Sequence, residues 1–305
     1  MNNTNKNLVS RILTITLLIA VSVFFASCNN LIVLHPKGLI GKEEAFLIRV
    51  AFSLMLIVII PVLILTFWFS VKYRADKKAR YMPNWAESKS IEWFIWMVPI
   101  AIIVVLSYLT WVKTFELDPY KPISGKNEPV HVEVISLDWK WLFIYPEYNI
   151  ATINQLVFPD NTPLEFRLTS ATVMTSFFIP QLGSQMYVMA GMQTRLNLIA
   201  GDTGTYTGQN QEFSGNGYET MFFEAKSVSK ADFNKWVQQV RQSTEKLDSN
   251  TFSEVIKPSD VHDITFFSGV APGLFDHLIK SFMNMDEEMK PGSDSHMNHD
   301  DSLME

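Results

Sequence analysis

Val130-His131-Val132-Glu133-Val134-Ile135 alternates valines with more polar residues over its first five positions. The alternation returns in Leu164-Glu165-Phe166-Arg167-Leu168-Thr169 and in Arg195-Leu196-Asn197-Leu198. Successive side chains of a β-strand point to opposite faces, so this pattern predicts strands with one face in a hydrophobic core. Gly, Pro, Asn and Asp residues separate the segments, as they do in all-β proteins. The C-terminal part of the chain is therefore predicted to be a β-sandwich or barrel.

Two long apolar runs, at residues 46–71 and 91–112, precede this region. A helix of about 20 residues crosses ~30 Å of hydrocarbon, so each run is long enough to span a membrane. Residues 72–80, directly after the first run, hold five Lys or Arg residues and one Asp. The positive-inside rule therefore predicts a helical hairpin whose loop is cytoplasmic. The β domain then lies outside, in the periplasm of a Gram-negative cell.

The N-terminal segment has the features of a bacterial lipoprotein signal. Lys6 and Arg11 lie near its start, residues 12–25 are largely apolar, and Ala26-Ser27-Cys28 follows. An apolar core this short favours a cleaved secretory signal over a spanning helix. Small residues directly before a cysteine resemble a lipobox, although Phe25 stands where Leu is usual. Residues 1–27 are thus predicted to be a signal peptide and Cys28 a lipid attachment site; the alternative is an ordinary buried cysteine.

Composition excludes several classes of function. The chain has 305 residues, of which 48% are hydrophobic, and a net charge of −6 without a basic stripe that would indicate nucleic acid binding. Its single cysteine excludes an internal disulfide and any metal site with several thiolates. No nucleophile constellation or phosphate-binding glycine loop stands out, so we expect no catalytic residue.

Four positions in the loop from Gly208 to Met221, and one position earlier in the chain, form a spaced motif. These positions hold Thr175, Asn210, Ser214, Tyr218 and Met221. With two flanking stretches, residues 138–147 and 176–187, the region resembles subunit II of the haem-copper respiratory oxidases. In the cytochrome c oxidase branch of that family, the loop reads Cys-x-x-x-Cys-x-x-x-His-x-x-Met. With one earlier His it holds a dinuclear copper centre, because thiolates and imidazoles suit copper.

Only Met221 matches that ligand set, and a lone methionine cannot hold such a centre. Since the copper pair accepts electrons from cytochrome c, the resemblance is to the quinol-oxidising branch, and specifically to subunit II of the bo-type ubiquinol oxidases. It implies a copper-free cupredoxin fold at residues 121–228, after a hairpin at residues 28–120. Glu212, which in the family links copper to a magnesium site, is interpreted as a loop residue without a metal.

The resemblance also implies a role in a complex at the bacterial inner membrane. That complex would oxidise ubiquinol, reduce oxygen to water and pump protons. Its haems and copper would belong to subunit I, with none in this chain. Subunits I and III and a further small membrane subunit would be the partners. The first alternative is a menaquinol oxidase subunit II, and a cytochrome c oxidase subunit is favoured much less. An alternative from a different class is a stand-alone lipoprotein that handles copper.

Glu92 lies at the cytoplasmic edge of the second apolar run. The simpler interpretation is an interfacial carboxylate that is hydrated or paired with a lysine. In oxidase subunit II, a Glu early in the second helix and several residues before a Pro lies at the mouth of a proton pathway. Ionisable residues at membrane depth are often functional, so Glu92 is the candidate for proton entry.

Helical periodicity returns after the sandwich, at residues 229–284. Ser229 is a candidate helix cap, and a second amphipathic helix is predicted at residues 272–282. This extension resembles the C-terminal region of ubiquinol oxidase subunit II and is expected to cover the domain or dock on subunit I. Residues 285–305 contain His296 and His299 among acidic and methionine residues, and are predicted to be disordered; copper capture is the alternative.

An aromatic row at period two, Trp139, Trp141, Phe143 and Tyr145, falls in the first of the two flanking stretches. In cytochrome c oxidases the corresponding segment lies beside the copper centre. Without copper, we expect these rings to pack the sandwich against the membrane-facing side of the complex.

Overall fold

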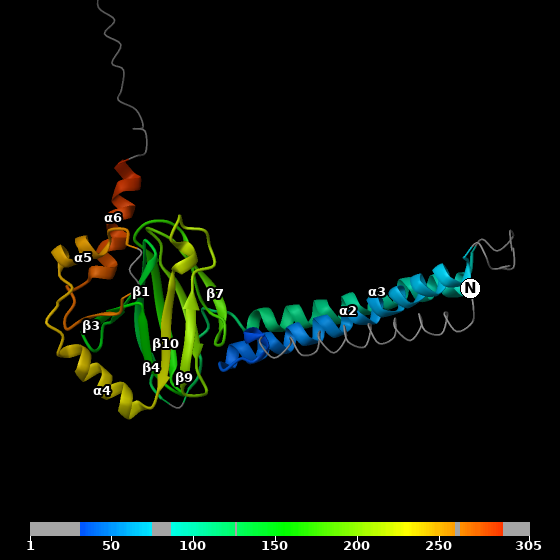
Figure 1. The fold of residues 1–305 in the computed structure, drawn as a ribbon, viewed down its shortest axis with the longest axis horizontal. Coiled ribbons are helices and arrows are strands. Elements are labelled where there is room, and N and C mark those ends of the chain that lie inside the picture. Colours follow the sequence, from blue (N-terminus) through cyan, green and yellow to red (C-terminus); the bar gives the residue numbers. More distant parts are fainter. Residues whose placement is uncertain (1–30, 75–86, 126, 260–262, 289–305) are drawn as a thin grey trace, which may run out of the picture.

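Two long helices project from a β-sandwich in the computed structural model, which describes residues 31–74, 87–125, 127–259 and 263–288 (Figure 1). The helices are α2 (Leu39–Lys72) and α3 (Lys89–Glu116), and a short 3₁₀ turn, η2 (Ile32–Leu34), precedes them. Both are long and apolar enough to cross a membrane. They extend beyond the two predicted apolar runs at both ends, and include Pro61 and Pro99.

The sandwich consists of a six-stranded and a five-stranded sheet. The first has the order β11-β3-β2-β1-β5-β8 and the second β4-β10-β9-β6-β7. Most neighbours are antiparallel, but β1 pairs in parallel with β5, and β4 with β10. The strands are β1 (Val130–Leu137), β2 (Lys140–Tyr145), β3 (Ile150–Ile153), β4 (Gln155–Pro159), β5 (Pro163–Ser170), β6 (Thr175–Ile179), β7 (Gly183–Val188), β8 (Thr194–Ile199), β9 (Gly204–Gln209), β10 (Phe222–Val228) and β11 (Thr265–Phe267). The predicted fold class, two spanning helices followed by a sandwich, is confirmed.

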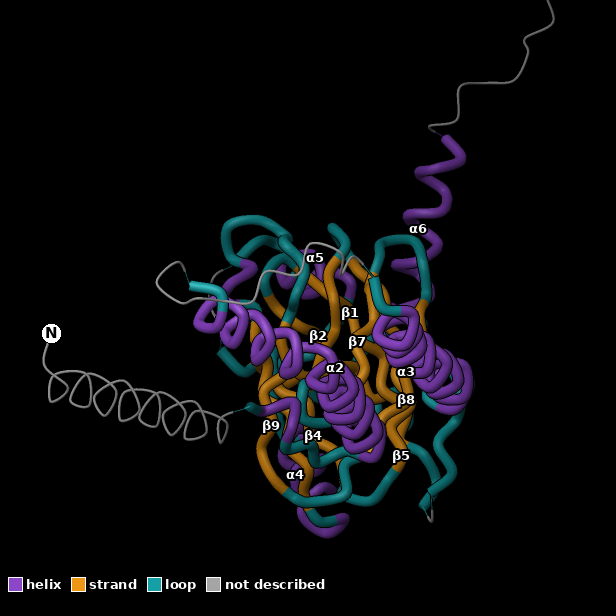
Figure 2. Tube along the Cα trace, turned by 90° about the vertical axis from the view of Figure 1, so that its right-hand side faces the viewer, coloured by secondary structure: helices purple, strands orange, loops and turns teal. Residues whose placement is uncertain are grey.

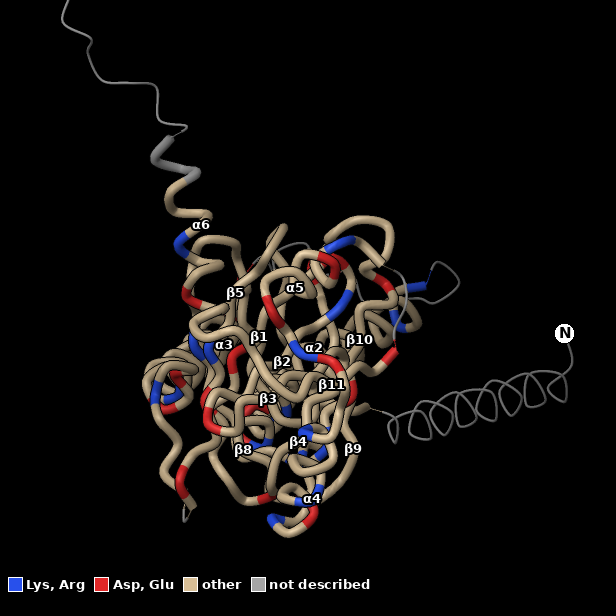
Figure 3. Tube along the Cα trace, turned by 90° about the vertical axis from the view of Figure 1, so that its left-hand side faces the viewer, with Lys and Arg blue, Asp and Glu red and all other residues tan. Residues whose placement is uncertain are grey.

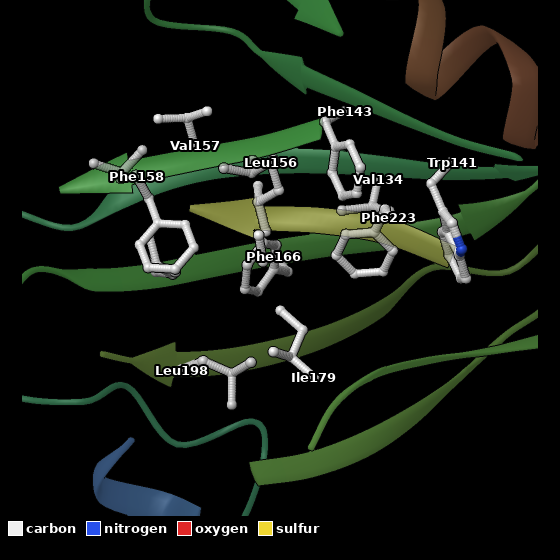
Figure 4. Packing of buried hydrophobic residues seen from close by; sticks show 14 of the residues in the cluster. Val134, Trp141, Phe143, Leu156, Val157, Phe158, Phe166, Ile179, Leu198 and Phe223 are labelled. Atoms are coloured by element: carbon white, nitrogen blue, oxygen red, sulfur yellow. The ribbon is translucent and has the colours of Figure 1, made fainter. Parts of the chain in front are cut away.

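The main core lies between the two sheets (Figure 4). The alternating strands supply it as their period predicts. Val130, Val132 and Val134 are buried there, and so are the apolar residues at alternate positions of β5 and β8. His131 between them is exposed. The period-two pattern thus identified the inward face of these strands correctly.

Three of the four residues of the aromatic row lie inside the protein and not against its membrane-facing side. Trp141, Phe143 and Tyr145 point inward from β2 and are fully buried between the sheets. Trp139 precedes β2 in the turn after β1 and has a left-handed φ of 63°. The expectation failed because sequence periodicity assigns residues to a face without showing what that face contacts.

The C-terminal extension belongs to the sandwich. It contains α4 (Lys230–Arg241), α5 (Ser249–Val255), β11 and α6 (Leu274–Glu288). The side chain of Ser229 accepts a hydrogen bond from the backbone N of Asp232 at 3.2 Å, which caps α4 as predicted. β11 pairs with β3 and so lengthens the six-stranded sheet. α6 runs to Glu288, so the first residues assigned to the tail are helical, and the rest of the tail lies outside the described residues.

A second core lies on the outer face of the six-stranded sheet, under this extension. β1 and β2 contribute Ile135, Leu137, Leu142 and Ile144 to it. The extension contributes Leu247, Phe252, Phe267, Leu274, Phe275 and Ile279. Strands covered on both faces are apolar on both faces, which explains why all six residues of β2 are buried.

The hairpin meets the sandwich where α2 begins (Figure 2). The backbone N of Gly41 donates to Leu182 O at 2.9 Å, in the turn between β6 and β7. Gly183, the first residue of β7, has a φ of +111°, and a Cβ there would lie 2.6 Å from Gly41 N. Glu44 Oε1 accepts from the backbone N of Ser184 at 3.0 Å. These contacts fix α2 directly to the sheet that carries the Gly208–Met221 loop.

Candidate functional site

The Gly208–Met221 loop closes one end of the sandwich between β9 and β10, and Asn210 is its hydrogen-bonding centre. Asn210 is 6% exposed. Its side-chain Oδ1 accepts from the backbone N of Ser176 at 2.9 Å and of Glu212 at 3.0 Å. Its Nδ2 donates to Glu212 O at 2.7 Å and to Ser214 Oγ at 3.1 Å. A single amide therefore joins the loop to the start of β6 and to itself.

Thr175 and Met221 are also satisfied within the protein. Thr175 Oγ1 donates to Ser136 Oγ at 2.7 Å, and both residues are buried. Met221 is 1% exposed and packs in the main core. Its backbone O accepts from Asn210 N at 3.2 Å. Asn210 and Ser214 are in direct contact, Met221 bonds to Asn210 through the backbone, and Thr175 is bonded to a different strand.

Trp139 closes the loop from the side of the β1–β2 turn. Its Nε1 donates to Ser214 O at 3.0 Å. Gly217 packs so closely on its ring that a Cβ at this position would lie 2.3 Å from a ring carbon. Tyr218 forms an edge-to-face pair with the exposed Phe213, with ring centroids 5.1 Å apart. The sequence alone did not indicate this contact of Trp139, because its position in a turn breaks the strand period.

The donor atoms at these five positions do not suit a copper pair. They are one amide, two aliphatic hydroxyls, one phenol and one thioether, whereas such a centre needs thiolates and imidazoles. No group of three His, Cys, Asp or Glu residues in the described part of the chain could hold a metal ion. What the arrangement does is hold the loop in a fixed conformation through hydrogen bonds.

Glu92 is not part of this loop, because it lies on α3. Glu92 is exposed in the first turn of α3, and its backbone N donates to Ser88 O at 2.9 Å. Cys28, His296 and His299 lie outside the described residues.

Basic and acidic residues are interspersed over the domain (Figure 3). The most connected of them is Arg167 on β5. It pairs with Glu133 and with Asp276 of α6, both at 2.7 Å, and its guanidinium lies 4.7 Å from the centroid of the Phe275 ring. Burial raises the pKa of Glu133 above its usual value, and Arg167 opposes this shift. Sequence analysis did not identify this network, which attaches the extension to the sandwich.

Two family models match the chain. The model of the periplasmic domain of cytochrome c oxidase subunit II matches residues 147–228. The model of the aromatic-rich motif of these oxidases matches residues 241–286, which covers most of the extension. The chain thus has a two-helix hairpin, a β-sandwich that matches the first model and an extension that matches the second. This combination defines the class of respiratory oxidase subunit II.

Similar curated proteins narrow this class. Subunit 2 of the cytochrome bo(3) ubiquinol oxidase of Pseudomonas putida is 47% identical over 90% of this chain and 86% of its own length. The protein of that name from Buchnera aphidicola subsp. Schizaphis graminum is 43% identical over 90% of this chain and 95% of its own. Quinol oxidase subunit 2 of Bacillus subtilis is 35% identical over 84% of this chain and 81% of its own.

The chain therefore belongs to the family of subunit 2 of the cytochrome bo(3) ubiquinol oxidases. The names of these relatives support the ubiquinol reading over the menaquinol alternative. They also place the chain in an oxidoreductase complex with other subunits, and its spanning helices are consistent with an inner membrane protein.

Proposed function

We propose that this chain serves an oxidase that takes its electrons from ubiquinol without a copper relay in the sandwich. The Asn210 network carries the proposal. Asn210 bonds to Ser176, Glu212 and Ser214, so the two positions that resemble the cysteine ligands, Asn210 and Ser214, are joined by a hydrogen bond. Electrons must then enter at another subunit, and this chain is a non-catalytic component.

The assembled complex would reduce oxygen to water and pump protons. Subunit I would hold the haems and copper, with subunit III and a further small membrane subunit as the other partners. The names of the relatives support a ubiquinol-oxidising complex of this type. This chain would hold the sandwich over the membrane subunits, which fits the direct attachment of α2 to the β6–β7 turn.

The start of α2 and the end of α3 would both lie on the periplasmic side of the membrane. The chain would be attached to lipid through Cys28. The cluster of Lys and Arg at residues 72–80 supports this orientation. The small residues Ala26 and Ser27 before the only cysteine support cleavage and acylation.

Glu92 would admit protons from the cytoplasmic side. The residues between Glu92 and Lys113 carry no charge and extend ~30 Å as a helix, which matches the hydrocarbon thickness. Glu92 thus lies at the inner boundary, where a carboxylate has access to water and to a neighbouring membrane subunit.

Co-purification tests the complex. An affinity tag on this chain should bring down a haem-containing subunit I, and the preparation should consume oxygen with ubiquinol as donor. A haem-free monomer that retains bound copper would instead support the stand-alone lipoprotein and contradict the proposal. Absorption spectra of the reduced and oxidised preparation distinguish the two outcomes.

A further inference from the structure

Arg49 is the charged residue that directly precedes the apolar stretch of α2, on the side of the sandwich. Between Arg49 and Lys72, α2 has no charged residue, and residues 50–71 extend ~33 Å, close to the ~30 Å of a hydrocarbon core. The charge-free stretch of α3 ends at Lys113. Arg49 and Lys113 therefore lie at similar depth at the outer boundary, with Lys72 and Glu92 at the inner one.

These two outer cations have different surroundings. Lys113 pairs with Glu43 at 2.8 Å and with Glu116 at 2.7 Å, so its charge is neutralised within the hairpin. Arg49 is exposed, and its Nε donates to Ala45 O of its own helix at 3.1 Å. No described carboxylate forms an ion pair with Arg49. A cation at this depth requires an anion or the headgroup layer.

The direction of the side chain indicates which anion it meets. Ala45 lies one turn closer to the start of α2, so the bond to its carbonyl directs the guanidinium towards the sandwich. In the proposed orientation, this is the direction of the periplasmic surface of the inner membrane. Because Nε is used by the helix, both terminal amino groups remain for a ligand. The groove between α2 and α3 is lined by Ile48, Phe52 and Met55 of α2, and Arg49 is not among its lining residues.

We propose that Arg49 binds the phosphodiester of a phospholipid in the outer leaflet. Two terminal amino groups match two phosphate oxygens in a bidentate, charge-assisted contact. Lys42, seven residues earlier, lies on the same helical face and is exposed nearer the surface, where it adds a second positive charge for the headgroup. The inference rests on the proposed orientation of the hairpin, because that orientation decides which leaflet Arg49 meets.

Native mass spectrometry of the tagged oxidase complex in mild detergent tests the proposal by counting retained phospholipids. Arg49→Gln should lower the count by one, and Arg49→Lys should retain most of it. Lys235→Gln, a matched loss of an exposed charge on α4, should leave the count unchanged. When phosphatidylglycerol is titrated back, the half-saturating concentration should rise about tenfold in Arg49→Gln, equivalent to ~1.4 kcal/mol.

An unchanged count and titration in Arg49→Gln would overturn the proposal. Loss of another oxidase subunit with unchanged phospholipid would also overturn it, since Arg49 would then pair with a protein carboxylate. If Arg49→Gln does not assemble, the wild-type complex in nanodiscs with a headgroup-photoreactive phospholipid gives the answer: label within residues 45–53 is expected, and its absence contradicts the contact. Protease added to intact spheroplasts reports the orientation separately, because it removes the sandwich only when that domain lies outside.

Discussion

Asn210 donates a hydrogen bond from Nδ2 to Ser214 Oγ at 3.1 Å, which joins two positions that hold cysteine ligands in the cytochrome c oxidase branch. An amide side chain has both donors and an acceptor, so Asn210 Oδ1 also accepts hydrogen bonds from the backbone N–H groups of Ser176 and Glu212. Hydrogen bonds from Asn210 join the loop to itself and to the start of β6. Asn210 is therefore central to the order of the loop, together with Trp139, whose Nε1 donates to Ser214 O.

Replacing Asn210 with Ala should destabilise the loop. The change leaves buried donors and acceptors without partners, which costs roughly 2–3 kcal/mol, whereas Ser214→Ala removes one partly exposed hydroxyl and costs about 1 kcal/mol or less. Limited proteolysis of the purified complex should therefore cleave residues 211–217 faster in Asn210→Ala than in Ser214→Ala. Equal cleavage rates for both variants and the wild type would show that Asn210 does not hold the loop.

The sandwich should bind no copper. The donor set of the loop lacks thiolate and imidazole ligands, so copper added to the purified chain and then removed by gel filtration should leave no stoichiometric metal on the domain. A truncation after Glu288 serves as the control, because the tail carries His296, His299 and two methionines beyond Met289. A dinuclear copper spectrum that persists in this truncation would contradict the interpretation of the loop.

Glu133 should give a pH-dependent contribution to stability. Burial raises its pKa in the folded protein above the unfolded value, so the folded state binds this proton more tightly. The contribution is fully present below the unfolded pKa and is lost as pH rises through the raised value. The unfolding free energy of the wild type, relative to Glu133→Gln, should fall as pH rises from about 4 towards neutrality. Chemical denaturation at several pH values measures this difference, and a flat or rising difference would contradict it.

Glu92→Gln should slow oxygen consumption if Glu92 admits protons. A tenfold loss of turnover corresponds to ~1.4 kcal/mol of added barrier, which we expect as the order of the effect. Glu87→Gln is the matched control, because Glu87 is exposed just before α3 begins and should retain turnover within about twofold of the wild type. Unchanged turnover in Glu92→Gln would contradict the proton-entry role and support the simpler interpretation, an interfacial carboxylate.

Local patterns in the sequence predicted much of this fold. The alternation of Val130, Val132 and Val134 identified the inward face of β1, and Ser229 identified the start of α4. Both signals are local, because they depend on strand period and on helix capping. α5 and β11 were not predicted, since β11 has three residues and is a strand only by pairing with β3.

The site was predicted in part for the same reason. Its residues were found by their spacing along the chain, but their partners are set by contacts across the fold. Thr175 bonds to Ser136 on the other sheet, and Trp139 reaches the loop from a turn about 75 residues away in sequence. No local pattern encodes such contacts. Arg49 was also overlooked, because one charge in a long apolar run barely changes its average hydropathy.

The choice of electron donor tests the central claim most directly. Oxygen consumption by the purified complex, tagged on this chain, should be measured with a short-chain ubiquinol and separately with reduced cytochrome c. We predict rapid, saturable turnover with ubiquinol and none above background with cytochrome c. Turnover driven by cytochrome c would contradict the claim that no copper relay exists in the sandwich.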